Sequence, residues 1–196
     1  MFAGKTEELI RRARRELYAK RSVQVFKPKI DNRYDEADVV THLGVKYPSI
    51  PVSGVEEMSQ IIEPETDTVL IEEAQFFDSK LVDLALLLAD RGKTVILAGL
   101  DMDFRRRPFG PMGDLLAIAD EVVKLQAICM HCGAPAIYTY RMVNGKPASF
   151  NDPIVLIGAQ EKYEARCRRC FALKDEPASR VKMDRLKPQR RPAALR

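Results

Sequence analysis

Short apolar runs alternate with longer amphipathic segments over residues 1–128. The runs that predict buried β-strands lie at 22–26, 68–71, 93–98 and 121–128. The segments with apolar residues on one helical face lie near 4–17, 55–62, 79–91 and 113–119. Strands that alternate with helices form sheets covered on both faces. The pattern therefore predicts an α/β fold with a mostly parallel sheet and flanking helices.

The pattern changes after residue 128. The run at 137–143 predicts a strand, the Asn-Gly that follows it predicts a tight turn, and a second apolar run lies at 154–157. Beyond residue 171, prolines and charges replace the apolar positions, which is typical of a disordered tail. We therefore expect three parts, which are an α/β domain at 1–128, a small β-rich unit at 129–171 and a basic tail at 172–196.

Charge is distributed unevenly between these parts. The chain carries 32 Lys and Arg against 28 Asp and Glu, a net charge of +4. Residues 173–196 hold eight of the basic residues and three of the acidic ones, which leaves 24 basic and 25 acidic residues elsewhere. A body without a basic excess lacks the electrostatic footprint of a polyanion-binding protein, so the charge argues against nucleic acid as a partner.

The sequence shows neither a membrane span nor a leader. The longest apolar stretch, at 81–89, contains Asp83 and falls short of the roughly 20 apolar residues that a bilayer span needs. The first residues lack a basic start followed by an apolar core. We expect a cytoplasmic protein with no membrane partner.

The cysteines form two Cys-x-x-Cys pairs, Cys129 with Cys132 and Cys167 with Cys170. Two residues between thiolates let both sulfurs bind one tetrahedral ion, and two such pairs complete a four-cysteine zinc site. Because a reducing cytoplasm disfavours disulfides, zinc is the better interpretation. A closed four-sulfur site has no open position for water, so we expect a structural zinc with His131 outside the ligand set. A zinc ribbon that binds nucleic acid is the alternative that this feature leaves open.

Three further motifs suggest phosphate chemistry. Gly-Lys-Thr at 4–6 opens the first predicted helix and matches the second half of a phosphate-binding loop, whose Lys reaches phosphate and whose Thr binds Mg²⁺. The strand at 68–71 releases Glu72 and Glu73 at its carboxyl end, where open α/β sheets bind ligands. One carboxylate can hold Mg²⁺ while the other accepts a proton from a substrate hydroxyl. The loop at 99–110 offers arginines for phosphoryl oxygens and phenylalanines for a base.

With these residues assembled, the chain resembles the zinc-containing, cellular-type thymidine kinases known as type II. The resemblance covers about residues 1–171 and rests on motifs in the family's order. They are Met-Phe-Ala-Gly-Lys-Thr at 1–6, Phe-Lys-Pro-Lys-Ile-Asp-Asn-Arg-Tyr at 26–34, Glu-Glu-Ala-Gln-Phe-Phe at 72–77, Gly-Leu-Asp-Met-Asp-Phe at 99–104, Pro-Phe-Gly at 108–110, both cysteine pairs, and Glu-Lys-Tyr-Glu-Ala-Arg-Cys at 161–167. The resemblance implies a P-loop NTPase-like sheet with a small zinc-ribbon subdomain that carries a lasso-like loop.

The resemblance also implies ATP-dependent phosphorylation of the 5′-hydroxyl of thymidine, and of deoxyuridine, in nucleotide salvage, with Glu73 as the base. ATP and Mg²⁺ would be bound by Phe2, Ala3, Gly4, Lys5, Thr6, Asp31, Arg33, Glu72, Ala74 and Gln75. The substrate would be bound by Met1, Phe76, Leu100, Phe104, Thr139, Ile154, Val155, Leu156, Ile157, Gly158 and Tyr163. The zinc would fix the ends of the segment at 154–158, which closes over the base. The family further implies a homotetramer and feedback inhibition by thymidine triphosphate.

The chain departs from the family pattern at two places. The family has Asp before the catalytic Glu, where this chain has Glu72, one methylene longer. A complete phosphate loop, G-x-x-x-x-G-K-T, would begin two residues before Met1, and the strand that feeds it would come earlier still. We expect in-frame coding sequence upstream of Met1 to supply a β-strand followed by Gly-Pro. The alternative is a truncated, catalytically silent relative that still binds nucleoside or zinc.

Overall fold

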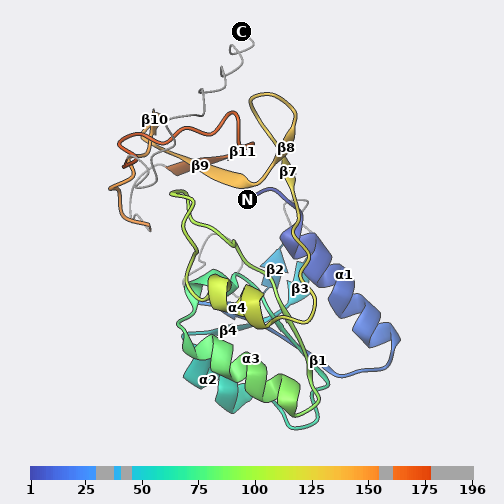
Figure 1. The fold of residues 1–196 in the computed structure, drawn as a ribbon. Coiled ribbons are helices and arrows are strands. Elements are labelled where there is room, and N and C mark those ends of the chain that lie inside the picture. The colour runs from blue at the N-terminus through green and yellow to red at the C-terminus, as the bar shows by residue number, and fades with distance from the viewer. Residues whose placement is uncertain (30–37, 41–45, 155–160, 178–196) are drawn as a thin grey trace. The chain divides into compact units, whose positions relative to one another are not determined.

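The computed structural model describes residues 1–29, 38–40, 46–154 and 161–177 (Figure 1). The chain divides into two compact units. We call the first the α/β unit, and it comprises residues 4–101 and 108–124. We call the second the cysteine unit, and it comprises residues 1–3, 102–107 and the chain from residue 125 onward.

The α/β unit is built on a four-stranded sheet with the order β4-β1-β5-β6. Its strands are β1 (Val23–Pro28), β4 (Ile50–Val52), β5 (Thr68–Ile71) and β6 (Thr94–Leu97). All three pairings between these strands are parallel. The predicted fold class, a mostly parallel sheet flanked by helices, is confirmed.

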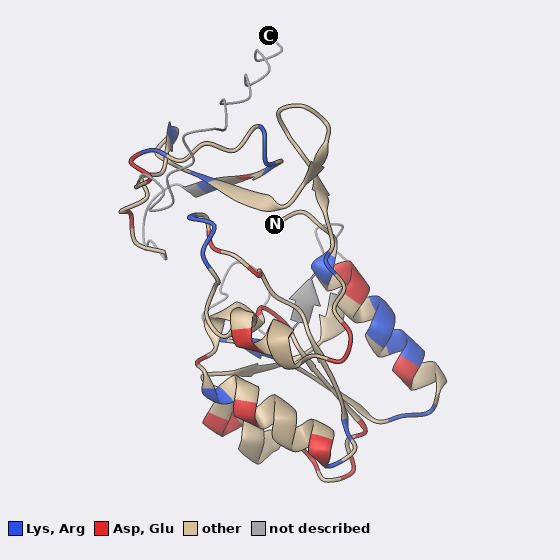
Figure 2. Cartoon of the chain, in the orientation of Figure 1, with Lys and Arg blue, Asp and Glu red and all other residues tan. Residues whose placement is uncertain are grey.

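Helix α1 (Lys5–Tyr18) packs on one face of this sheet. Leu9, Ile10 and Ala13 recur at helical spacing, are buried, and form a core cluster with Leu70 of β5. Charged side chains of both signs occupy much of the rest of the helix (Figure 2). Two acidic residues in the first turn face the positive end of the helix dipole, which favours a helix start at this point.

The opposite face of the sheet carries the larger core. Three helices and one 3-10 turn contribute to it: α2 (Val55–Ile61), η1 (Ala74–Phe76), α3 (Lys80–Asp90) and α4 (Met112–Ile118). The core residues on this face include Phe26, Val52, Met58, Val69, Ile71, Leu81, Leu88 and Met112. Successive residues of a strand point to opposite faces, so β1, β5 and β6 each supply both cores. This double coverage holds the carboxyl end of β5 in a fixed position.

Strand β6 ends the sheet among the described residues, and its side chains are less buried than those of β5. The apolar run expected to form a strand at 121–128 differs from the expectation. Only Ala127–Ile128 (β7) is a strand, and Val122 and Val123 are 43% and 52% exposed. An apolar run becomes a strand only where a neighbouring strand can pair with it, and β6 pairs only with β5 within the described part of the chain.

Two further short strands, β2 (Asp38–Val40) and β3 (Lys46–Pro48), form an antiparallel pair. Their pairing places Val39 beside Tyr47. Within the described residues, no helix is both long and apolar enough to cross a bilayer.

The cysteine unit contains an antiparallel sheet with the order β10-β9-β11. Its strands are β9 (Tyr138–Val143), β10 (Lys146–Pro147) and β11 (Glu161–Arg166). The predicted tight turn is present, because Asn144 and Gly145 have φ angles of 49° and 75° between paired strands. A separate pair joins β7 to β8 (Pro135–Ala136) and frames the first Cys-x-x-Cys segment.

Candidate functional site

The first helix of the α/β unit begins with a geometry suited to an anion. Gly4 precedes α1 in the left-handed region, with φ 73° and ψ 27°. The first N–H groups of an α-helix have no partner within the helix, and the helix dipole adds positive potential there. Lys5 is the first residue of α1, so a lysine directly follows the left-handed glycine at this helix end.

The hydroxyl of Thr6 reaches the end of β5. Thr6 Oγ1 donates a hydrogen bond of 2.6 Å to Glu72 Oε1, and Glu72 is only 9% exposed. Hydroxyl and carboxylate oxygens are the ligands that Mg²⁺ prefers. The extra methylene of Glu72, relative to Asp, therefore still allows direct contact between the two predicted metal-binding side chains.

Glu73 has a strained backbone at the carboxyl end of the sheet. Its φ and ψ angles are 49° and 43°, a left-handed conformation that is uncommon for residues other than glycine. Gln75 Nε2 donates a hydrogen bond to Glu73 Oε2, and Gln75 is 2% exposed. Gln75 Oε1 in turn accepts the Leu100 N–H at 3.0 Å. One buried amide thus fixes the Glu73 carboxylate relative to the loop after β6.

Glycines of two sequence motifs pack directly against Gln75. A methyl group at Gly99 would lie 2.8 Å from Gln75 Oε1, and one at Gly110 would lie 2.2 Å from the Gln75 carbonyl oxygen. Gly110 also has a φ of 51°, which favours glycine. These positions accept no larger residue without moving Gln75. The Gly-Leu-Asp and Pro-Phe-Gly motifs therefore have a local structural role around Glu73.

An aromatic residue that closely follows the acidic pair in the chain packs against a second ring, from the loop after β6. Phe76 and Phe109 form an edge-to-face pair with ring centres 5.5 Å apart and an interplanar angle of 81°. Such pairs hold each other in place beyond simple burial. Phe76 is therefore fixed within the α/β unit, one residue after Gln75.

In the cysteine unit, the loop at 102–107 is organised by one buried carboxylate. The Asp103 side chain, 1% exposed, accepts the backbone N–H groups of Arg105 and Arg107 at 2.8 and 3.0 Å. Arg105 Nε adds a third hydrogen bond at 2.9 Å. Phe104, which is 4% exposed, is held at the start of this turn. Asp103 was missed by the sequence reasoning, although an Asp two residues before its N–H partner is a recognisable turn signal.

Other predicted substrate-binding residues also lie in the cysteine unit. The Met1 amine donates a hydrogen bond of 3.3 Å to Thr139 Oγ1 on β9. Tyr163 lies on β11 in register with Arg141 of β9, and Ile154 is 36% exposed. Arg141 was also missed by the sequence reasoning. The only feature of the sequence that singles out Arg141 is its charge within the predicted strand at 137–143.

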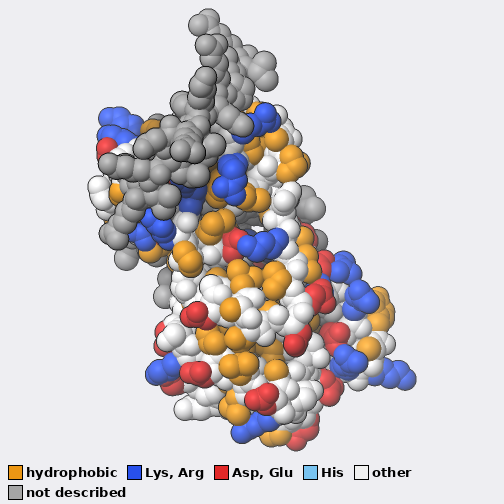
Figure 3. Space-filling view, viewed as in Figure 1, with side chains coloured by type: hydrophobic (Ala, Val, Ile, Leu, Met, Phe, Trp, Pro, Cys, Tyr) orange, Lys and Arg blue, Asp and Glu red, His pale blue; other side chains and the backbone are white. Residues whose placement is uncertain are grey.

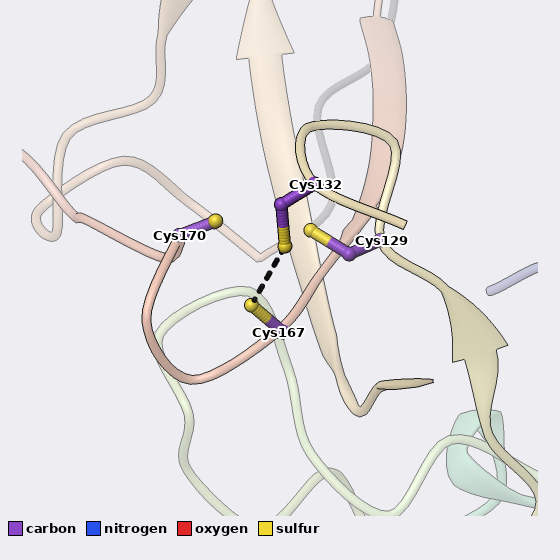
Figure 4. Close-up of side chains that lie close together, drawn as sticks. All are labelled: Cys129, Cys132, Cys167 and Cys170. Carbon is purple, nitrogen blue, oxygen red and sulfur yellow. Dashed lines mark hydrogen bonds between the residues drawn. The ribbon is translucent and has the colours of Figure 1, made fainter. Parts of the chain in front are cut away.

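The four cysteines form a compact cluster in the cysteine unit (Figure 4). Their Sγ atoms all lie within 4.8 Å of one another, and those of Cys132 and Cys167 are 3.6 Å apart. Gly133, with φ 72°, donates its N–H to the Cys129 carbonyl at 2.9 Å and so closes the first turn. Four sulfurs from two turns match the donor set of a structural zinc site. The four thiols can therefore bind a zinc ion.

The thiols differ in protonation when no metal balances their charge. Burial raises the pKa of Cys129, but N–H groups of the two turns outweigh it and lower the pKa to about 6. Burial and the neighbouring thiols raise the pKa of Cys170 to about 12. The cluster therefore stabilises one thiolate but disfavours ionisation of a further thiol, because no positive charge balances a second negative one. A divalent cation would supply that charge.

Several predicted site residues lie outside the described part of the chain. They are Asp31, Arg33, Val155, Leu156, Ile157 and Gly158. The remaining predicted residues divide between the units. The α/β unit holds Gly4, Lys5, Thr6, Glu72, Glu73, Ala74, Gln75, Phe76 and Leu100. The cysteine unit holds Met1, Phe2, Ala3, Phe104, Thr139, Ile154, Tyr163 and the four cysteines.

The described residues thus combine a parallel sheet, a helix start suited to an anion, an adjacent acidic pair and a four-cysteine cluster that could bind zinc. A comparison with protein-family models matches residues 1–171 to thymidine kinase. The chain belongs to the thymidine kinase family, whose members phosphorylate thymidine in nucleotide salvage. The resemblance found in the sequence is confirmed.

Proposed function

We propose that this chain transfers the γ-phosphoryl group of ATP to the 5′-hydroxyl of thymidine, and also of deoxyuridine. Membership of the thymidine kinase family supports the reaction class. The observation that carries the proposal is the arrangement after β5. There Glu72 accepts the Thr6 hydroxyl, and Glu73 is held by the buried amide of Gln75.

Glu73 is the proposed general base. A 5′-hydroxyl is a weak nucleophile, and phosphoryl transfer needs alignment, charge neutralisation and a group to take the proton. The Gln75 hydrogen bond engages one carboxylate oxygen of Glu73 and fixes its orientation. In this proposal the other carboxylate oxygen would take the proton of the substrate hydroxyl. General-base assistance of this kind contributes about 10²- to 10⁴-fold to a rate.

The start of α1 is the proposed binding site for the ATP phosphates. Helix N–H groups after Gly4 would donate to phosphate oxygens, and the Lys5 ammonium would neutralise their charge. Thr6 and Glu72, already in hydrogen-bonding contact, would hold Mg²⁺. When bound, this ion would neutralise phosphate charge.

The cysteine unit is proposed to supply contacts to the thymine base. Phe104 and Thr139 are buried, and both lie in this unit, as do Met1, Ile154 and Tyr163. Cys129, Cys132, Cys167 and Cys170 would hold zinc and so fix the strands on either side of the segment at 154–158. Fixing those ends in advance reduces the ordering entropy lost on binding.

A product assay with the full chain tests this function. Thymidine and ATP should yield thymidine 5′-monophosphate and ADP in equal amounts, and deoxyuridine should yield its monophosphate. If the chain makes no monophosphate, it is the catalytically silent relative.

A salt-dependent DNA-binding titration separates the zinc-ribbon alternative. The proposed enzyme should show no DNA binding that survives removal of residues 178–196. Binding by that shortened chain, with affinity that falls steeply as salt rises, together with no kinase activity, would favour the nucleic-acid-binding alternative.

We further propose a cytoplasmic homotetramer that thymidine triphosphate inhibits. Leu86 and Leu87 of α3 are 42% and 45% exposed, and Ile118 of α4 is 37% exposed. Hydrophobic side chains gather over these helices on the face shown in Figure 3. Exposed apolar patches of this kind favour self-association. Light scattering on the purified chain measures the oligomeric state, and product assays at increasing thymidine triphosphate measure the inhibition.

A further inference from the structure

Arg141 is a charged residue that lies buried in the cysteine unit. It lies on β9 and is 2% exposed. Arginine is almost never buried without specific partners, because removing its charge from water is costly. An apolar side chain of similar size would fill the same volume without that cost. The identity of its partners therefore indicates why an arginine stands at this position.

The guanidinium of Arg141 connects two elements that are distant in sequence. Its Nη1 donates to the carbonyl oxygens of Pro153 and Ile154, at 2.5 and 3.3 Å. Its Cζ lies 4.9 Å from the ring centre of Phe104, within the range of a cation–π interaction. The planar guanidinium can stack on a ring and donate in its own plane at the same time, which an ammonium group cannot do.

We propose that Arg141 is a positioning residue for thymidine binding, which holds the backbone at Pro153–Ile154 against Phe104. This inference rests on the proposed function, in which Phe104 and Ile154 contact the base. Arg141 belongs to the cysteine unit, whereas the acidic pair and the start of α1 belong to the α/β unit. Its loss should therefore weaken nucleoside binding and leave phosphoryl transfer unchanged. A raised KM with an unchanged turnover number is expected when a residue stabilises the bound ground state and the transition state equally.

Arg141→Met tests the proposal, because methionine keeps most of the volume and removes the donors and the charge. The thymidine KM should rise about tenfold or more, the loss expected for a charge-assisted hydrogen bond. The turnover number and the ATP KM should stay within about threefold. Arg141→Lys keeps a charge and one donor, so its thymidine KM should fall between those of the wild type and the methionine variant.

Arg166→Met is the matched control. Arg166 lies on the adjacent strand β11, and its Cζ is also 4.9 Å from a ring centre, that of Tyr140. Its ion pair is to Glu164, not to the 153–154 backbone. This variant should keep the wild-type thymidine KM. Zinc content and thermal melting are measured for every variant, and if the methionine variant does not fold, the Arg141→Lys result decides.

Hydrogen exchange gives a readout that does not depend on activity. Amides at 150–154 should exchange faster in Arg141→Met than in Arg166→Met, while those of α3 should be unchanged. If the wild-type chain lacks kinase activity, the proposed function fails and this comparison alone decides whether Arg141 holds the segment. Equal exchange in the two variants, an unchanged thymidine KM in Arg141→Met, or an equal rise in both variants would overturn the proposal.

Discussion

Replacing Gly110 by Ala tests whether packing around Gln75 controls the position of the catalytic base. The added methyl would lie 2.2 Å from the Gln75 carbonyl oxygen. Non-bonded heavy atoms pack at about 3.5 Å, so relieving this contact requires a movement of about 1 Å. Gln75 binds the Glu73 carboxylate and the Leu100 N–H, and its displacement should move both.

The expected effect on catalysis is large relative to the size of the change. A misplacement of about 1 Å costs about 10²-fold in rate when it affects reacting groups. We therefore expect the turnover number of Gly110→Ala to fall about 10²-fold. Its thymidine KM should rise by a smaller factor than the fall in turnover number, because Leu100, a predicted substrate-binding residue, is bonded to Gln75.

Gly92→Ala is the control, because it isolates the backbone cost. Gly92 has a φ of 79°, and a methyl group there would meet no atom within 4 Å. Both variants force a non-glycine residue into the left-handed region, at a cost of about 1 kcal/mol in stability. Only the Gly110 variant adds the clash. Steady-state kinetics, with thermal melting to confirm folding, compares the pair.

Equal turnover numbers for the two glycine variants would show that packing at Gly110 does not control the position of Glu73. In that case, the contact between Gly110 and Gln75 would relax without moving Glu73. A fall in both turnover numbers would point instead to backbone strain as the cause.

Three further predictions concern the metal cluster and the first helix. Chelating the zinc should unfold the cysteine unit and abolish its thermal transition while the helical circular dichroism of the α/β unit persists, because zinc binding supplies folding energy. Zinc affinity should fall as pH is lowered, because all four thiols must ionise to bind the metal, including Cys170 with its pKa raised to about 12. Titration calorimetry in buffers of different ionisation enthalpy measures the number of protons released on zinc binding. Hydrogen bonds from Arg11 and Arg12 lower the pKa of Glu8 to about 2. The ionised Glu8 carboxylate therefore stabilises the folded chain fully above about pH 4.5, and this contribution is lost as the pH falls through about 2. Glu8→Gln should accordingly lower the unfolding free energy by less than about 1 kcal/mol at pH 7, and the difference should vanish near pH 2 in denaturant titrations.

The parts of the fold with strong local signals were predictable from the sequence. The strand expected at 68–71 is β5, and α1, α2, α3 and α4 lie within two residues of their expected limits. In these segments, apolar spacing, turn residues and burial all favour the same structure. The Asn-Gly turn was equally predictable, because few two-residue sequences adopt two positive φ angles.

The elements that were missed depend on pairing partners that the local sequence does not reveal. Ile50–Val52 contains Pro51, which disfavours a strand, yet it pairs at the edge of the sheet, where a missing N–H is tolerated. Glu161–Arg166 is highly charged, but its register with β9 makes it a strand. Conversely, residues 121–126 have strand-like composition and remain outside any strand. In each case tertiary pairing outweighs intrinsic preference.

The candidate site was predictable where its chemistry depends on residue type and spacing, as with the cysteine pairs and the acidic pair. The supporting contacts were not predictable. That Gln75 binds Glu73, or that Arg141 reaches the backbone at Pro153, follows from the geometry of loops whose conformations are set by packing. The roles of such residues become visible only when the distances are known.

The role of Glu73 as the base of a thymidine kinase is tested by replacing it with glutamine and measuring the rate of product formation. The rate of thymidine monophosphate formation is compared between the wild-type chain and Glu73→Gln at saturating ATP and thymidine. Glutamine keeps the size of the side chain and removes its ability to accept a proton. We expect the rate to fall about 10²- to 10⁴-fold, with thymidine affinity nearly unchanged. A Glu73→Gln rate close to that of the active wild-type chain would contradict this role of Glu73.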